Sequence, residues 1–420
     1  MDEPEESSRE RPARTVGGLL SSLEQVVCSR LDDLEAGSRR RRLEISPAFA
    51  APAPLPPGQR MIDLTHNDYL GLRADPEFQE RVRAAVADLP VGSGGSRLLG
   101  GEHPVFTALE REFAHFKGAP DALYFPSGYA ANEAVASALA RLPDVAFHSD
   151  ALNHASLIDG IRLGGLPKER RPVFRHRDLA HLEQLLAAST ARFNVIFTES
   201  VFSMDGDVAD LAGIARLARA YRGVLVVDEA HAILCLGQDG QGLAATSGLG
   251  SDELITVNTC GKALGAAGAL VAGPTWIKEF LVNTARPFIY TTAPSPWTAA
   301  ALRVALHMAP GLAQRRTRLT RLADAVRTEL ARYGYDTGAS TTHILPLIVG
   351  ADTAALRFSA ALADRAIHVR AIRPPTVPEG TARLRLSLHA ALADTDAQRL
   401  IDTFARLSQT SEVTGSKHHD

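Results

Sequence analysis

The chain has few cysteines, no long apolar run and little net charge. Its three cysteines among 420 residues form no CxxC pair and no even disulfide framework, which favours a reduced, cytoplasmic compartment. No run of about 18 apolar residues occurs, so we expect no membrane span. The acidic, polar N-terminus has no apolar core of a secretory signal, and its acidic residues argue against a mitochondrial presequence. A net charge of −3 gives no basic field for nucleic acid.

What is present is enough apolar material for one or two domains, since 45% of the residues are hydrophobic. Residues 1–60 are expected to form an extension. Its first 14 or so residues look disordered by composition, an amphipathic helix is predicted over about 16–36, and a proline-rich connector over 47–57. We predict a large domain over 61–299, a smaller C-terminal α+β domain over 300–408 and a flexible tail over 409–420.

An α/β pattern follows residue 61. Short apolar runs without polar alternation predict strands buried on both faces, at 122–125, 195–198, 224–227, 254–257 and 269–272. A helix is predicted from Pro104, with Val105, Leu109, Phe113 and Phe116 on one face and Gly118 at its end. Such alternation predicts a doubly wound, mostly parallel sheet. Beyond residue 300 we predict helices at 302–312, 319–333 and 394–407, and strands at 344–349 and 382–388.

Two motifs carry the chemistry. VVDEAHA places Asp228 and His231 after one predicted strand, and TCGKALG places Lys262 after the next. Ligands of parallel α/β sheets collect at the carboxyl ends of strands, so these groups should share one crevice. They suit pyridoxal 5′-phosphate (PLP): a desolvated lysine forms a Schiff base, a carboxylate keeps the pyridine nitrogen protonated, and His231 can hydrogen-bond the phenolic oxygen.

The DEAH tetrapeptide also occurs in nucleotide-hydrolysing helicases. There a GxxxxGK[ST] loop should come earlier in the chain, whereas here the Gly-Lys pair follows. Thr256 also replaces the first glycine of that loop, and Ala263 replaces the hydroxyl residue. A nucleic-acid-dependent ATPase is therefore disfavoured.

Further motifs are ambiguous when each is taken alone. GSGGSRLLGG (92–101) is either a loop that approaches a ligand or partner, or a flexible turn. FPSGYAAN (125–132) offers backbone N–H groups to a phosphate, or is an ordinary turn. His154 could stack on the cofactor ring, Ser203 could donate to its oxygen, and Thr291 and Thr292 add hydroxyls before a bend.

The segment RPPTVPEGTARLRLSL supplies three arginines. Its alternation puts Arg383 and Arg385 on one face of a strand. One of these, or Arg373, could bind a substrate carboxylate through a bidentate fork; a solvated strand face is the alternative.

Taken in order, HNDYLGL, GSGGSRLLGG, FPSGYAAN, HASL, VFSMDGD, DEAH, TCGKALG and RPPTVPEGTARLRL resemble the α-oxoamine synthase family of fold-type I PLP enzymes, over residues 61 to 408. The resemblance implies that the large domain binds PLP. Lys262 would form the Schiff base, Asp228 would pair with the ring nitrogen and His154 would stack on the ring. His231 and Ser203 would contact the phenolic oxygen.

The resemblance also implies phosphate and substrate contacts. The phosphate contacts would be Gly128, Tyr129, Thr259 and, from the other subunit of a homodimer, Thr292. The segments AIRPPTVPEGTARLRL and ILPLIVG are similar to those of the biotin-pathway member, which joins L-alanine to a pimeloyl thioester on coenzyme A or acyl carrier protein. Asn67 and Arg385 would bind the substrate carboxylate, with Thr376 and Arg40 near the acyl group. No metal is expected.

The chain also departs from the family pattern. Ala232, Ile233 and Leu234 replace Gly-x-Gly after DEAH, and Cys260 replaces an aromatic residue. A related synthase that uses glycine, serine or another acyl thioester therefore stays open. So does a catalytically silent binding subunit, although the retained Lys262 speaks against it.

Overall fold

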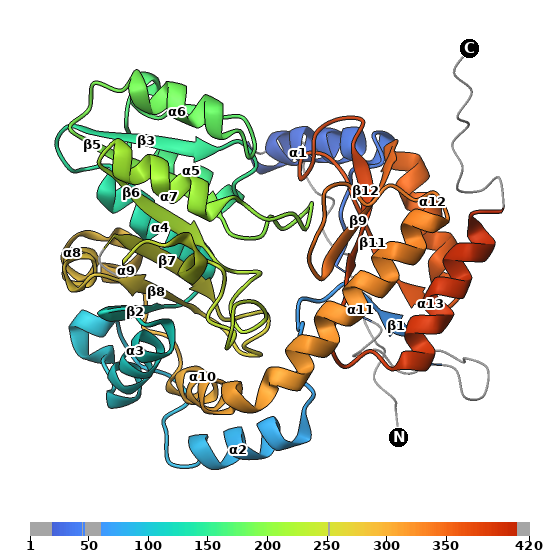
Figure 1. The fold of residues 1–420 in the computed structure, drawn as a ribbon, viewed down its shortest axis with the longest axis horizontal. Helices are drawn as coiled ribbons and strands as arrows, with labels where there is room; N and C mark the ends of the chain where they lie inside the picture. Colours follow the sequence, from blue (N-terminus) through green and yellow to red (C-terminus); the bar gives the residue numbers. More distant parts are fainter. Residues whose placement is uncertain (1–18, 44, 47–59, 251–252, 410–420) are drawn as a thin grey trace, which may run out of the picture.

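The computed structural model describes residues 19–43, 45–46, 60–250 and 253–409 (Figure 1). The disorder predicted for the first residues, the proline-rich connector and nearly all of the flexible tail lie outside the described residues.

A seven-stranded sheet forms the centre of the larger part of the molecule (Figure 1). Its order is β2-β8-β7-β6-β5-β3-β4, and all neighbours are parallel except β8, which is antiparallel to both β2 and β7. The strands are β2 (Asp121–Phe125), β3 (Val145–Asp150), β4 (Val173–Phe174), β5 (Phe193–Glu199), β6 (Gly223–Asp228), β7 (Leu254–Thr259) and β8 (Ala269–Gly273). The predicted strands and the mostly parallel sheet are confirmed.

Helices cover both faces of this sheet. Alternate strand residues point to opposite sides: Val195 and Phe197 pack in one apolar cluster, and Ile196 packs in another. The first cluster includes residues of α4 (Gly128–Leu139), α5 (Ala155–Leu163), α8 (Thr275–Thr284) and α9 (Arg286–Ile289). The second includes residues of α6 (Leu179–Ala187) and α7 (Leu211–Ala220). Burial on both faces explains why these strands are continuous apolar runs.

Helix α3 (Pro104–Lys117) has the ends that its sequence predicts. Pro104 occupies the first turn, where a missing N–H costs nothing, and the His103 side chain accepts a hydrogen bond from the Val105 N–H. Gly118 ends the helix with φ of 65°, a left-handed conformation that glycine adopts without strain.

The smaller part is built on an antiparallel sheet in the order β11-β12-β9. Its strands are β9 (Ile344–Gly350), β11 (Arg370–Ile372) and β12 (Ala382–Ser387), and its helices are α12 (Asp352–Ala363) and α13 (Asp394–Leu407). Helices α10 (Pro296–Met308) and α11 (Ala313–Arg332) lead into it, and α2 (Pro76–Val86) lies beside α10 (Figure 1). A domain boundary between residues 299 and 300, which fall within α10, stays a prediction.

A parallel pair joins a segment near the start of the chain to the smaller part of the molecule, because β1 (Ile62–Asp63) pairs with β10 (Ile367–His368). The segment that follows β1 is thereby held against the C-terminal sheet, where the Leu64 carbonyl accepts a hydrogen bond from the Ser387 N–H at 3.0 Å. Short 3₁₀ helices occur at Lys168–Arg170, Ala244–Ser247 and Ala309–Leu312, and Arg97–Gly101 forms an irregular turn in which Leu99 and Gly100 have non-helical φ and ψ.

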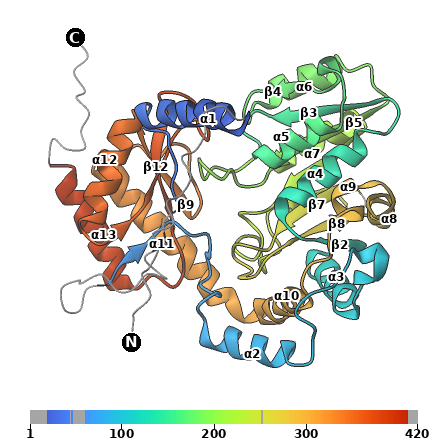
Figure 2. The ribbon, with the colours of Figure 1, turned by 180° about the vertical axis from the view of Figure 1, so that it is seen from behind.

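The predicted N-terminal helix is confirmed as α1 (Leu19–Ala36), which lies beside the small sheet (Figure 2). Within the described part of the chain most of its predicted apolar face is uncovered, since Leu20 is 82% exposed and Val26 is 67% exposed. Among the described residues, no helix combines the length and apolar character needed to cross a membrane.

Candidate active site

Three parallel strands of the large sheet end side by side at one edge. Glu199 at the end of β5 is in register with Asp228 at the end of β6, and Asp228 is in register with Val257 of β7. Lys262 follows shortly after β7. These carboxyl ends point toward the small sheet (Figure 1). The predicted meeting of the DEAH and TCGKALG motifs is confirmed.

Lys262 contacts a histidine, which in turn contacts a tyrosine. Its Nζ lies 2.9 Å from His231 Nε2, and His231 Nδ1 lies 2.6 Å from the Tyr69 hydroxyl. Burial lowers the pKa of Lys262 to about 8, although Asp228 and Glu199 oppose the shift. The lysine can therefore be uncharged at mildly alkaline pH, as a nucleophilic amine requires. Burial, with the charge of Lys262, also holds the pKa of His231 well below its usual value.

Asp228 and His154 are connected through two buried side chains. Asn132 Nδ2 lies 2.6 Å from Asp228 Oδ2 and 2.9 Å from Ser156 Oγ, and that hydroxyl lies 2.7 Å from His154 Nδ1. The Ala230 N–H donates to the other oxygen of Asp228 at 2.9 Å. Because the amide of Asn132 must donate to a carboxylate, its orientation is chemically determined. These hydrogen bonds fix the position of Asp228, predicted to pair with the nitrogen of the PLP ring, relative to His154, predicted to stack on that ring.

The start of α4 forms a cradle with β7. A Cβ atom added to Gly128 would lie 2.3 Å from Thr259 Oγ1, so only glycine fits beneath that hydroxyl. Ser127 caps the helix by accepting from the Ala130 N–H at 3.1 Å. Exposed backbone N–H groups at a helix start suit a phosphate. Tyr129 is exposed, its hydroxyl donates to Asp159, and its ring centroid lies 6.5 Å from that of His154. A lysine, a carboxylate, an imidazole face and this cradle together fit PLP.

Arg385 is a second buried basic residue of the site. Its guanidinium donates to Asn67 Oδ1 at 3.0 Å and to the Tyr69 hydroxyl at 3.3 Å, and its Nε donates to the Ser203 carbonyl. Arg383, the other candidate on the strand, is instead paired with Asp205 at 2.5 Å. The structure thus brings Asn67 and Arg385 together and separates the roles of the two arginines. The contact from Arg385 to Ser203 uses the serine's backbone carbonyl.

Arg40 and Thr376 belong to a second region. A cleft of about 490 Å³ is lined by Glu35, Ser38, Arg40, Arg41, Arg42, Leu356, Arg370, Ala371 and Arg373. The Arg41 guanidinium donates to Thr376 Oγ1 at 3.4 Å, and Arg40 lies 3.7 Å from Glu35. Positive charge therefore gathers beside β11, where Arg370 lies opposite Arg385 of β12.

Thr292 is exposed, on the segment between α9 and α10. The neighbouring Ala293 N–H donates to the Gly95 carbonyl at 2.9 Å, so the Gly-rich segment 92–101 lies beside this bend. The described part of the chain contains no group of three or more His, Cys, Asp or Glu side chains suited to a metal ion.

The sequence reasoning missed four residues of the site: Tyr69, Asn132, Glu199 and His343. Burial and the neighbouring Asp228 raise the pKa of Glu199 well above its usual value. Burial lowers the pKa of His343, whose ring lies 4.0 Å from that of Tyr69, to about 3. Tyr69 and Asn132 stand inside the motifs HNDYLGL and FPSGYAAN, but their partners come from distant parts of the chain.

The departures from the family pattern lie in the core. Ala232, Ile233, Leu234 and Cys260 are fully buried and pack in one apolar cluster. Leu234 adopts φ of 65°, a left-handed conformation that costs a non-glycine residue about 1–2 kcal/mol. These substitutions change packing behind the site and remove none of the polar groups described above.

Comparison with known proteins agrees with this geometry. The family model for class I and II aminotransferases matches residues 59–404. The 8-amino-7-oxononanoate synthase of Cupriavidus necator is 45% identical over 365 residues, which cover 84% of this chain and 89% of that protein. The enzyme of the same name from Anaeromyxobacter sp. (strain K) is 44% identical over 370 residues, covering 87% and 91%.

Solved structures of two related enzymes share the fold of this chain. Serine palmitoyltransferase from Sphingomonas wittichii superposes with a TM-score of 0.81 and 26% identity, covering 93% of this chain and 99% of that chain. The 8-amino-7-oxononanoate synthase of Francisella tularensis has a TM-score of 0.70 and 28% identity, covering 83% and 97%. The chain therefore belongs to the class I and II aminotransferase family, and within it to the 8-amino-7-oxononanoate synthases, which are PLP-dependent acyltransferases.

Proposed function

We propose that this enzyme condenses L-alanine with a pimeloyl thioester and releases carbon dioxide, giving 8-amino-7-oxononanoate for biotin biosynthesis. The observation that carries the proposal is the pairing of the buried Arg385 with Asn67 beside the Lys262–His231–Tyr69 chain. When bound, PLP supplies an electron-accepting ring that stabilises negative charge at the α-carbon of the amino acid.

Lys262 is suited both to hold the cofactor and to move a proton. Its amine has a lowered pKa and lies 2.9 Å from His231 Nε2, so it can take up the α-proton of the amino acid directly or through a water. Asp228, fixed by Asn132, offers an anion to the ring nitrogen. His154 offers a flat face to the ring.

Arg385 is suited to bind the carboxylate of the amino acid. Its guanidinium is buried and already oriented by Asn67, Tyr69 and the Ser203 carbonyl. A bidentate fork would hold the carboxylate in one geometry. This side chain would therefore fix the orientation of the bound amino acid.

The arginine-lined cleft is suited to the carrier of the acyl group. It has five guanidinium groups and one carboxylate on its lining. Coenzyme A and the prosthetic arm of acyl carrier protein both carry phosphates, which arginine binds well. We therefore place the phosphate end of the thioester against Arg40 and its neighbours, with Thr376 on the path to the acyl group.

We further propose a cytoplasmic homodimer in which Thr292 of each subunit reaches the phosphate cradle of the other. Thr292 is exposed, and its bend lies against the Gly-rich segment 92–101, which is consistent with such a shared site.

The test is identification of the product by mass spectrometry after incubation of the holoenzyme with a pimeloyl thioester and L-alanine, glycine or L-serine in parallel. We expect the mass of 8-amino-7-oxononanoate with alanine alone. A product with glycine or serine and none with alanine would overturn the proposal. Parallel reactions with the coenzyme A and acyl carrier protein thioesters identify the carrier.

A further inference from the structure

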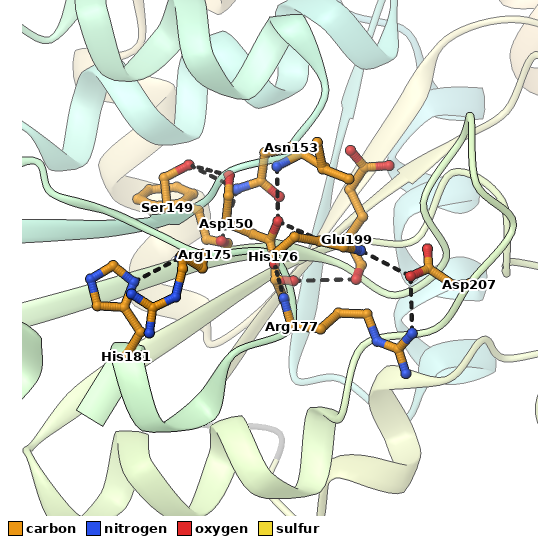
Figure 3. A network of polar contacts seen from close by, with 12 residues as sticks. Ser149, Asp150, Asn153, Arg175, His176, Arg177, His181, Glu199 and Asp207 are labelled. Atoms are coloured by element: carbon orange, nitrogen blue, oxygen red, sulfur yellow. Dashed lines mark hydrogen bonds and ion pairs between the residues drawn. The ribbon is translucent and has the colours of Figure 1, made fainter. Parts of the chain in front are cut away.

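One histidine outside the active site ties together two loops that belong to it. His176 Nδ1 lies 2.9 Å from Asp150 Oδ1, and His176 Nε2 lies 2.9 Å from Asp207 Oδ2 (Figure 3). Because a carboxylate only accepts hydrogen bonds, both ring nitrogens must donate to satisfy this arrangement. The ring therefore carries both protons and is an imidazolium between two carboxylates.

The next residue repeats the same bridge. The Arg177 N–H donates to Asp150 Oδ2 at 3.1 Å, and its guanidinium donates to Asp207 Oδ2 at 3.0 Å. Arg177 does so with φ of 57°, a conformation that is unfavourable for a residue with a side chain. The surrounding contacts therefore hold the backbone at this point in place.

Asp150 supports the loop that ends at His154. Its carboxylate accepts from the Leu152 N–H at 2.9 Å, and its carbonyl accepts from the Asn153 N–H at 3.2 Å. The Asn153 amide then donates to the Phe197 carbonyl of β5 at 2.8 Å. The position of His154 is thus built on Asp150.

Asp207 closes the turn that presents Ser203. Its carbonyl accepts from the Phe202 N–H at 3.0 Å, and the Phe202 carbonyl accepts from the Gly206 N–H at 2.9 Å. The ring of Phe202 packs edge-on against His176, with centroids 4.4 Å apart. The carbonyl of Ser203 on this turn is the acceptor of Arg385.

We propose that His176 is a positioning residue that fixes the loop of His154 relative to the turn that orients Arg385. Without the imidazolium, the carboxylates of Asp150 and Asp207 would repel each other, and only Arg177 would offset their negative charge. Both loops would shift, and the carboxylate anchor of the amino acid would shift with them. This inference rests on the proposed function, in which Arg385 binds that carboxylate.

The charge on His176 persists to alkaline pH. Burial lowers the pKa of the ring, but the hydrogen bonds to Asp150 and Asp207 outweigh it and raise the pKa to about 9. The charged groups facing the ring are Asp150 at the end of β3, Asp207 after β5, and Arg177 in its own segment. Since the folded pKa is raised, the bridge is intact near neutral pH and is lost as the pH rises through about 9.

The experiment measures L-alanine binding to the holoenzyme from the change in its absorption spectrum. We expect His176→Ala to weaken binding by about 10- to 100-fold, the scale expected for a displaced positioning group, and added imidazole to restore it in part. His181→Ala is the matched control, because its ring accepts a hydrogen bond from the Arg175 N–H and, among the described residues, makes no hydrogen bond to Asp150 or Asp207 (Figure 3). This control should bind alanine as the wild type does.

Asp207→Asn provides a second route if His176→Ala does not fold. It keeps the histidine but removes one carboxylate, so the alkaline fall in alanine binding should move to lower pH. The inference is overturned if folded His176→Ala binds alanine as tightly as the wild type, or if Asp207→Asn keeps the wild-type pH profile. A wild-type enzyme that does not bind alanine would instead overturn the proposed function.

Discussion

Replacement of Asn132 by leucine tests how the site holds its key carboxylate. The leucine is similar in size but cannot donate, so Asp228 loses the 2.6 Å hydrogen bond from Asn132 and Ser156 loses the 2.9 Å bond. Hydrogen bonds to charged groups contribute about 1.5–3 kcal/mol. Since about 1.4 kcal/mol is tenfold in an equilibrium constant, the affinity for PLP should fall by about 10- to 150-fold.

The assay is titration of the cofactor-free protein with PLP, followed by absorbance, with thermal unfolding measured in parallel to confirm that the variant is folded. Ser156→Ala is the matched control. It leaves the Asn132–Asp228 bond in place and releases only the His154 side of the hydrogen-bond chain, so its PLP affinity should fall by less than that of Asn132→Leu. A folded Asn132→Leu variant that binds PLP as tightly as the wild type would refute the reasoning.

Three further predictions concern single side chains. Attachment of PLP to the cofactor-free protein should become faster as the pH rises through about 8, because the neutral amine of Lys262 is the nucleophile. Borohydride reduction of the attached cofactor should then mark Lys262 in the peptide map. The Lys262→Ala variant should show no covalent attachment and no marked peptide. Arg385→Lys keeps the charge but loses the fork, so the KM for L-alanine should rise at least about tenfold with PLP affinity unchanged; an unchanged KM would contradict the assigned role. Lys117→Met leaves the buried Glu229 carboxylate without its cation, so urea unfolding should show a loss of about 3–5 kcal/mol, whereas a loss near zero would argue against this pair as a structural contact.

The sequence predicted five of the seven strands of the large sheet, because strands buried on both faces are usually apolar throughout. It did not indicate β3, whose second half is the polar sequence His-Ser-Asp, or β4, which has only two residues. It also predicted the meeting of Asp228, His231 and Lys262, since these residues follow strands of one parallel sheet. It did not reveal that β8 is antiparallel to its neighbours, because the alternation of side chains is the same in both directions. Nor did it indicate β1, whose two residues are too short a run to be noticed.

Contacts between distant segments account for the remaining differences. The Gly-rich segment 92–101 was expected to be a loop. Its backbone is irregular in the structure, since Leu99 and Gly100 have non-helical φ and ψ, but its ion pairs were not foreseen: Arg97 is paired with Glu102 and with the buried Glu110 of α3. Tyr69 could not be assigned to the site because its partner His231 lies 162 residues away. Such pairings are set by the closed fold, and a local pattern does not contain them.

The pairing of β1 with β10 also orders events during synthesis. Residues 62–69 leave the ribosome early, yet β1 acquires its partner strand only when Ile367 and His368 have been made. The strands that carry Asp228 and Lys262 are complete long before that point, so the cofactor half of the site can form while the chain is still growing. The half that contains Asn67, Tyr69 and Arg385 closes last, and an unfinished chain therefore has no formed anchor for the substrate carboxylate.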